Sequence, residues 1–153
     1  MKLVIQRCKR ASVTVSDQVV GSIGPGALIL LAVAADDSEE EARMLARKVS
    51  KLRMYDDADG RLNASIAETG GSFLVVSQFT LYGDCRKGNR PSYIRSAEPG
   101  KAQYLYEYFV RELSNLGHTV ETGRFRETMQ VELVNDGPVT LILERESEKE
   151  ELD

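Results

Sequence analysis

The chain has 153 residues, of which 42% are apolar and 29% are charged, and its formal net charge is −4 at pH 7. This composition is typical of one ordinary soluble domain and excludes intrinsically disordered, collagen-like and disulfide-dense proteins. No apolar run approaches the ~20 residues of a membrane span, and the N-terminal apolar stretch is too short for a signal peptide, so we expect a cytoplasmic protein without membrane contact.

The first 35 residues predict β structure. Apolar and polar residues alternate over residues 12–16, and a tight connection leads to a second strand over residues 19–23. After a Gly-Pro-Gly sequence, residues 27–33 form a continuous apolar run with the length of a strand that is buried on both faces.

Two amphipathic helices are predicted, over about residues 38–53 and 99–116. In the first, Ser38 and Glu41 make a capping box, and apolar residues recur at spacings of three and four. The second has Pro99 in its first turn and a glycine directly after its last turn.

Three further strands are predicted over residues 72–81, 129–134 and 139–143. The first is apolar but carries polar residues in its C-terminal half. The last two are joined by Asn-Asp-Gly-Pro at residues 135–138, a turn-forming tetrad. Because the chain shows no repeat and no long linker, we predict a single α+β domain, β-rich with barrel-like or antiparallel sheets and two main helices.

Charge is concentrated in two segments. Residues 144–153 hold six acidic and two basic side chains, so we divide the chain into a domain over residues 1–145 and an acidic, solvated C-terminal tail over residues 146–153. Residues 84–101 hold five basic and two acidic side chains. This second segment is either a phosphate-contacting loop or an ordinary solvated loop.

The sequence lacks the motifs of several common chemistries. His118 is the only histidine and no G-x-S-x-G motif occurs, which argues against a Ser-His-Asp hydrolase. There is no P-loop and no dinucleotide-binding glycine motif, and Cys8 and Cys85 stand far apart without a ligand cluster. We therefore expect no cofactor and no metal.

Polar residues follow two apolar runs, in Ser-Gln-Phe-Thr-Leu at residues 77–81 and in Asn-Asp-Gly-Pro-Val-Thr at residues 135–140. Each motif alone is compatible with strand ends and turns. Together they resemble the D-aminoacyl-tRNA deacylases, homodimeric enzymes that hydrolyse the ester between a D-amino acid and the 3′ end of tRNA. Further matches lie at residues 5–7, 10–15, 71–72, 90–92, 122–125 and 129–131, and the resemblance extends to about residue 145.

The resemblance implies a homodimer with active sites at the subunit interface. Gly137 and Pro138, joined by a cis peptide bond, would enter the partner's active site and form a chirality filter and substrate-binding segment with Val139 and Thr140. Rigid main-chain carbonyls there would exclude L-amino acids by steric clash. Since glycine has no side chain to exclude, the resemblance also implies hydrolysis of glycyl-tRNA.

The resemblance places the catalytic wall at Ser77, Gln78, Phe79 and Thr80. The backbone N–H groups of Phe79 and Thr80 are candidates for stabilising the oxyanion of the reaction. Thr80 is an alternative nucleophile, but no nearby histidine or lysine motif supplies the base that its hydroxyl would need. We favour a positioning role, with the 2′-hydroxyl of the terminal adenosine assisting the reaction as in the family.

Three supporting residues follow from the same resemblance. Arg7 and Met129 match positions that brace the Gly-Pro loop, and Phe125 matches a position that lines the adenosine pocket, where it would stack on the base. Each is also compatible with an ordinary role in the core or in a strand. Two other functions stay open: a sibling deacylase with relaxed chirality and a non-catalytic nucleic-acid-binding module.

Overall fold

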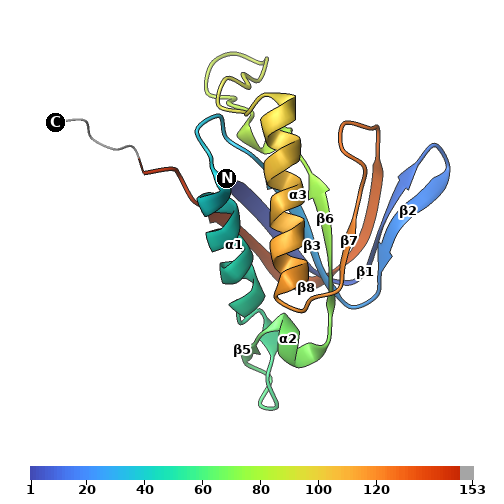
Figure 1. Ribbon diagram of the computed structural model, residues 1–153. Helices are drawn as coiled ribbons and strands as arrows, with labels where there is room; N and C mark the ends of the chain where they lie inside the picture. The colour runs from blue at the N-terminus through green and yellow to red at the C-terminus, as the bar shows by residue number, and fades with distance from the viewer. Residues whose placement is uncertain (149–153) are drawn as a thin grey trace.

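Strand β1 (Lys2–Val15) is the centre of the sheet in the computed structural model, which describes residues 1–148 (Figure 1). It pairs along one edge with β8 (Gln130–Glu144), and along the other with β3 (Gly26–Ala32) and then β2 (Gln18–Ile23). From β3 the sheet continues through β6 (Ser72–Ser77) to β7 (Val120–Thr122). The apolar run of β3 is buried between β1 and β6, as predicted.

The pairs β3–β6 and β6–β7 are parallel, so each needs a crossover connection. The first crossover contains α1 (Glu39–Lys51), a small sheet of β4 (Tyr55–Asp56) and β5 (Leu62–Ala64), and α2 (Ile66–Thr69). The second contains the short 3-10 helix η1 (Phe79–Tyr82) and α3 (Pro99–Asn115).

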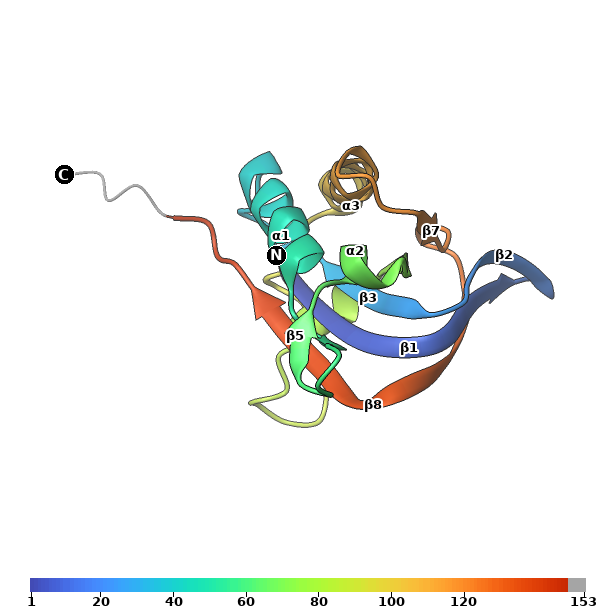
Figure 2. The same ribbon diagram turned by 90° about the horizontal axis from the view of Figure 1, so that it is seen from below.

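The sheet curls until its edge strands β2 and β7 lie side by side (Figure 2). At Gly21 of β2 an added Cβ would lie 2.3 Å from the carbonyl oxygen of Thr122 in β7, so this approach requires glycine. The β1–β2 hairpin turns at Ser16 and Asp17, whose φ values of 48° and 63° fit a type I′ turn. The predicted β-rich α+β fold with a barrel-like sheet is confirmed.

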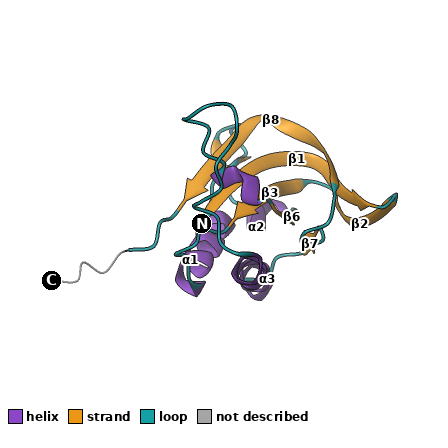
Figure 3. Cartoon of the chain, turned by 90° about the horizontal axis from the view of Figure 1, so that it is seen from above, coloured by secondary structure: helices purple, strands orange, loops and turns teal. Residues whose placement is uncertain are grey.

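Helices α1 and α3 cover one face of the sheet, as Figure 3 shows. Their buried residues recur at helical spacing, including Leu45 and Val49 in α1 and Phe109 and Leu113 in α3. A second buried cluster, which includes Val13, Leu28, Leu74 and Val76, fills the opposite face. No helix among residues 1–148 is long and apolar enough to span a membrane.

Both predicted helices are confirmed, and the capping box predicted for the first is present. The carboxylate of Glu41 accepts hydrogen bonds from the Ser38 backbone N–H at 2.6 Å and from its hydroxyl at 2.7 Å. At the start of α3, the Glu98 carboxylate accepts from the backbone N–H groups of Gly100 and Lys101. These hydrogen bonds lower the pKa of Glu98.

The strand predicted over residues 72–81 is wrong in its last part. Strand β6 ends at Ser77, opposite Leu31, because the neighbouring strand β3 ends there and offers no further ladder. Gln78 donates one last backbone hydrogen bond to Leu31, and the chain then turns into η1.

The turn predicted at residues 135–138 is also wrong, because the chain does not reverse there. Strand β8 runs on as one antiparallel partner of β1, but its register jumps from Asn135 opposite Cys8 to Thr140 opposite Gln6. Residues 136–139 therefore bulge out of the ladder against a single residue, Arg7. The Gly137–Pro138 peptide bond within this bulge is cis.

The predicted acidic tail is described only in part, since residues 149–153 lie outside the described residues. After β8, the backbone N–H of Arg145 donates to Met1, and the Glu146 carboxylate pairs with Arg95 at 3.1 Å. The start of the tail is thus held against the domain at these two points.

Candidate functional site

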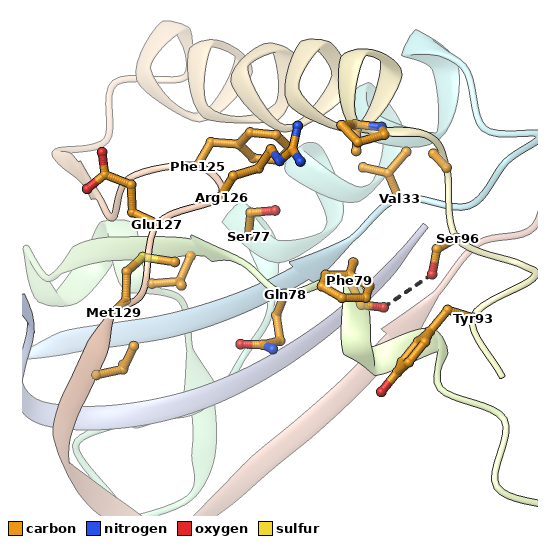
Figure 4. A pocket seen from close by; sticks show the side chains of 15 residues that line it. Val33, Ser77, Gln78, Phe79, Tyr93, Ser96, Phe125, Arg126, Glu127 and Met129 are labelled. Carbon is orange, nitrogen blue, oxygen red and sulfur yellow. Dashed lines mark hydrogen bonds between the residues drawn. The ribbon is translucent and has the colours of Figure 1, made fainter. Parts of the chain in front are cut away.

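A cavity of about 630 Å³ opens where β6 ends and α3 begins (Figure 4). Its volume lies within the range of small-molecule sites. One wall is the end of β6 with the start of η1, and the other is the segment between β7 and β8. The lining residues are Val33, Val76, Ser77, Gln78, Phe79, Tyr93, Ser96, Ala97, Pro99, Ala102, Phe125, Arg126, Glu127, Met129 and Val131.

The first wall is positioned by contacts of its backbone with neighbouring segments. The Gln78 N–H donates to the Leu31 carbonyl at 2.7 Å, and the Ser96 hydroxyl donates to the Phe79 carbonyl at 3.4 Å. The Phe79 ring meets the Tyr93 ring edge to face, with 5.1 Å between centroids. The half-exposed Phe79 ring thus stands at the cavity mouth (Figure 4).

The backbone N–H groups of Phe79 and Thr80 donate to no acceptor within residues 1–148. Two adjacent free N–H groups are the arrangement that can bind the oxygen of a tetrahedral intermediate in acyl transfer. The Thr80 hydroxyl, by contrast, accepts a hydrogen bond from the Gln78 amide at 2.5 Å. Thr80 is exposed and does not line the cavity.

The second wall carries an aromatic ring held from behind. Phe125 stacks on Tyr106 of α3, with 6.3 Å between centroids and 28° between ring planes. Tyr106 is buried and donates its hydroxyl to the Val75 carbonyl at 2.7 Å. Burial raises the pKa of this hydroxyl, so Tyr106 stays neutral. Phe125 therefore presents a fixed ring to the cavity.

The cavity is poor in acid–base groups. Arg126 and Glu127 are its only charged lining residues, and no histidine, lysine or cysteine lines it. Within residues 1–148 no three His, Cys, Asp or Glu side chains gather as a metal site would require. The groups that this site offers to a ligand are mainly main-chain donors, an amide, hydroxyls and aromatic faces.

A second cluster of predicted residues surrounds the bulge in β8. The buried Arg7 guanidinium donates to the carbonyls of Asp136 and Met54, each at 3.0 Å. The Asn135 amide donates to the Arg7 carbonyl at 2.9 Å and to the Val139 carbonyl at 3.3 Å, which closes the bulge across its base. With Val139 buried in the core, the bulge is anchored at both ends.

The surroundings of Arg7 combine charge with burial. Its guanidinium lies 3.4 Å from the Asp136 carboxylate and 3.7 Å from that of Asp56. Burial raises the pKa of the nearby Cys8 thiol and of the Tyr55 hydroxyl, so both groups stay neutral. The exposed surface of the bulge is formed by Gly137 and Pro138.

The structure brings the predicted site residues together in two separate groups. Ser77, Gln78, Phe79, Phe125 and Met129 line the cavity. Around the bulge lie Arg7, Gly137, Pro138, Val139 and Thr140, the last of which accepts a hydrogen bond from Gln6 at 3.2 Å. None of the bulge residues lines the cavity, and Met129 lies with the cavity rather than with the bulge.

The two groups are far apart within one chain. Thr140 and Leu74 share one row across β8, β1, β3 and β6, so they lie about 14 Å apart along the sheet. Strands β6 and β8 run in the same direction. Ser77 lies three residues after Leu74 in β6, whereas Pro138 lies two residues before Thr140 in β8, so the two are further apart than that row. The bulge therefore lies away from the cavity of its own chain.

The basic segment over residues 84–101 is less basic in space than in sequence. Arg86 makes a bidentate pair with Asp84, and its guanidinium lowers the pKa of that carboxyl to about 2. Arg95 lies 3.1 Å from Glu146 and 3.6 Å from Glu144. Much of the positive charge is thus neutralised by acids, some of them distant in sequence.

Several lining residues were not predicted. Tyr93 and Ser96 fall within the basic segment, where the sequence indicated only phosphate contact. Arg126 directly follows Phe125 in the matched motif, but an isolated arginine carries no pattern that marks it. Helix η1, which presents the free N–H groups, was not predicted because the sequence indicates a continuous strand over residues 72–81.

Fold and site together define an α+β domain with a barrel-like sheet and a cavity lined by main-chain donors and aromatic rings. The chain belongs to the D-Tyr-tRNA(Tyr) deacylase family, whose model matches residues 4–144. It is 53% identical over 146 residues to the D-aminoacyl-tRNA deacylase of Symbiobacterium thermophilum, covering 95% of this chain and 97% of that one. The D-aminoacyl-tRNA deacylase of Thermosipho africanus is 54% identical over 144 residues, covering 94% and 97%. The predicted family is confirmed.

Solved structures agree with this placement. A c-Myc DNA unwinding element binding protein superimposes with a TM-score of 0.90 at 35% identity, covering 96% of this chain and all of its own. A probable eukaryotic D-amino acid tRNA deacylase reaches a TM-score of 0.80 at 16% identity, covering 93% and 97%, and supports the fold alone.

Proposed function

We propose that the protein hydrolyses the ester bond of D-aminoacyl-tRNA and releases the free D-amino acid and tRNA. The observation that carries this proposal is that residues 77–79, Phe125 and Met129, which lie in stretches that resemble the deacylase family, line one cavity. We place the reaction in the cytoplasm, the compartment of the tRNA substrate.

The proposed chemistry uses few side chains. Water adds to the ester carbonyl, the bond to the ribose 3′-oxygen breaks, and the proton of the water ends on that oxygen. The free N–H groups of Phe79 and Thr80 would stabilise the oxyanion between these steps. Gln78 and Thr80, joined by a hydrogen bond, would position the ester, and the 2′-hydroxyl of the tRNA would assist the proton transfer.

We further propose that chirality is read by a second copy of the chain in a homodimer. Gly137 and Pro138 would enter the partner's active site, where their carbonyls would fill the space of an L side chain. Two observations support this arrangement: Gly137 and Pro138 are exposed, and the bulge that carries them lies far from the cavity of its own chain. Glycyl-tRNA would pass the same filter, since glycine lacks a side chain in either position.

We assign the reaction to residues 1–145 and give the tail over residues 146–153 no catalytic role. The resemblance to a DNA-unwinding-element-binding protein keeps a second function in view, a module that binds nucleic acid without turnover. A sibling deacylase with relaxed chirality is the third reading.

The decisive measurement is the hydrolysis of D-tyrosyl-tRNA, L-tyrosyl-tRNA and glycyl-tRNA by the purified protein with a chelator present. We expect the D and glycyl esters to be cleaved and the L ester to survive. Cleavage of both tyrosyl esters would identify the relaxed sibling. Binding of tRNA without cleavage would identify the binding module.

The same assay tests the filter through a Pro138→Ala variant. Loss of the rigid ring should loosen the carbonyls, so we expect the D-to-L rate ratio to fall by at least tenfold, or about 1.4 kcal/mol of discrimination. Pro25→Ala, at an exposed proline in the β2–β3 turn, is the matched control and should keep the wild-type ratio. An unchanged ratio in Pro138→Ala would refute the filter.

A further inference from the structure

The charged groups of the cavity leave one cation without a protein partner. Of its two charged lining residues, Arg126 makes no ion pair and no side-chain hydrogen bond within residues 1–148. In Figure 4 the Arg126 side chain extends on the side of its segment that faces the other lining residues, whereas the Glu127 carboxylate points away from them. The guanidinium is thus free for a ligand.

The backbone conformation at Arg126 also indicates a role in ligand binding. Its φ of 65° lies in the left-handed region that favours glycine, and the position nevertheless carries a long, charged side chain. Residues held in such conformations gather at ligand sites. The preceding residue, Phe125, is fixed by its stack on Tyr106, so the turn that carries Arg126 is anchored on one side.

We propose that Arg126 binds the phosphate that joins the terminal nucleoside of the tRNA to the nucleotide before it. This inference rests on the proposed function and adds a substrate-binding residue to it. In a nucleotide, base and phosphate are joined through one ribose. An aromatic ring and a guanidinium that line one cavity, as those of Phe125 and Arg126 do, match that pair of groups by stacking and by charge-assisted hydrogen bonds.

The charge balance of the molecule fits this role. In the basic segment over residues 84–101, which the sequence suggested for phosphate contact, Arg86 and Arg95 form ion pairs with acidic side chains. A reader of the 3′ end that touches few phosphates needs one well-placed cation, and arginine binds phosphate with two parallel hydrogen bonds. Arg126 then adds affinity for the 3′ end of the tRNA and takes no part in the reaction at the ester.

The test compares substrates that differ only in the phosphate. Arg126→Gln should raise KM on the order of tenfold for D-tyrosyl-tRNA and for the D-tyrosyl ester of adenosine 5′-monophosphate, and leave kcat unchanged. For the D-tyrosyl ester of adenosine, which has no phosphate, KM should not change. Arg126→Lys should restore part of the loss, and the salt dependence of log KM for tRNA should weaken by about one charge in Arg126→Gln.

Arg124→Gln is the matched control, because Arg124 is an exposed arginine of the same segment that does not line the cavity. It should behave as the wild type with all three substrates. An equal rise in KM for the adenosine ester would show that Arg126 acts only on the shape of the site and would overturn the proposal. An absence of any effect would overturn it as well.

A binding measurement separates this inference from the proposed function. The wild type should bind adenosine 5′-monophosphate more tightly than adenosine, and Arg126→Gln should remove that difference. If no ester is cleaved but this difference behaves as expected, the proposed function fails and the phosphate contact stands. If D-tyrosyl-tRNA is cleaved but the difference is missing or survives in Arg126→Gln, the phosphate contact fails alone.

Discussion

The bulge in β8 interrupts the backbone hydrogen bonds between β1 and β8, and the Arg7 side chain donates hydrogen bonds in this region instead. Its guanidinium satisfies the carbonyls of Asp136 and Met54, which burial would otherwise leave without donors. We therefore expect Arg7→Ala to lower the free energy of unfolding by about 2–4 kcal/mol, measured by urea denaturation. Arg10→Ala, an exposed arginine of the same strand, should change it by less than about 0.5 kcal/mol. Similar losses in the two variants would contradict this account.

The sequence predicted individual site residues only where a motif carried them. Ser77, Gln78 and Phe79 were assigned to one wall and do line the cavity. Thr80 was grouped with them, but the turn into η1 places it outside. Their catalytic roles stay predictions. The proposed role of Arg126 could not be predicted, because it depends on the lack of an ion pair within residues 1–148, which only the fold reveals.

At the scale of elements, the junction of α1 and α3 holds the only histidine. His118 follows α3, its Nε2 lies 2.5 Å from the Ser50 hydroxyl of α1, and its ring meets Phe73 edge to face. Burial lowers the pKa of His118 below its usual value of 6.5. At pH values between the folded and the unfolded pKa of His118, the unfolded chain binds more protons than the folded one. The contribution of His118 to the free energy of unfolding is therefore full above pH 6.5 and is lost as pH falls toward the folded pKa.

We expect an NMR titration of this single histidine to give a midpoint below 6.5. His118→Asn should show a smaller loss of unfolding free energy than the wild type between pH 7.5 and pH 5.5. A midpoint at or above 6.5, or equal losses in the two proteins, would contradict the assignment.

Elements with a periodic sequence were predicted well, and those defined by pairing were not. The spacing of apolar residues and the caps fixed both long helices, since these signals are local. Strand β6 is shorter than predicted because its end depends on where β3 ends, and the residues of β6 themselves do not encode that position. The tetrad at 135–138 predicts a turn, but Asn, Asp, Gly and Pro also suit the bulge that the structure shows.

At the scale of the whole molecule, β8 leaves one edge of the sheet unpaired. Within residues 1–148 it pairs only with β1, and it exposes Ile142 at 68% and Leu141 at 36%. An open edge with exposed apolar residues is a surface that a second chain can cover. We expect Ile142→Lys to dissociate the proposed homodimer and to lower D-tyrosyl-tRNA hydrolysis at least tenfold, as measured by analytical ultracentrifugation and the deacylation assay.

Val19→Lys is the control for that variant, because Val19 is 64% exposed on β2, away from the β8 edge. It should leave both mass and activity as in the wild type. A dimeric, fully active Ile142→Lys protein would move the proposed interface to another face.

The contact between β2 and β7 links the β1–β2 hairpin to the segment that lines the cavity. The backbone that touches Gly21 belongs to Thr122, and the residues that follow Thr122 build the aromatic wall. Because Gly21 lets β7 approach β2 closely, it helps to fix the position of the segment that begins after Thr122 and lines the cavity. A substitution at Gly21 should therefore alter the affinity of ligands in the cavity, although those ligands do not touch β2.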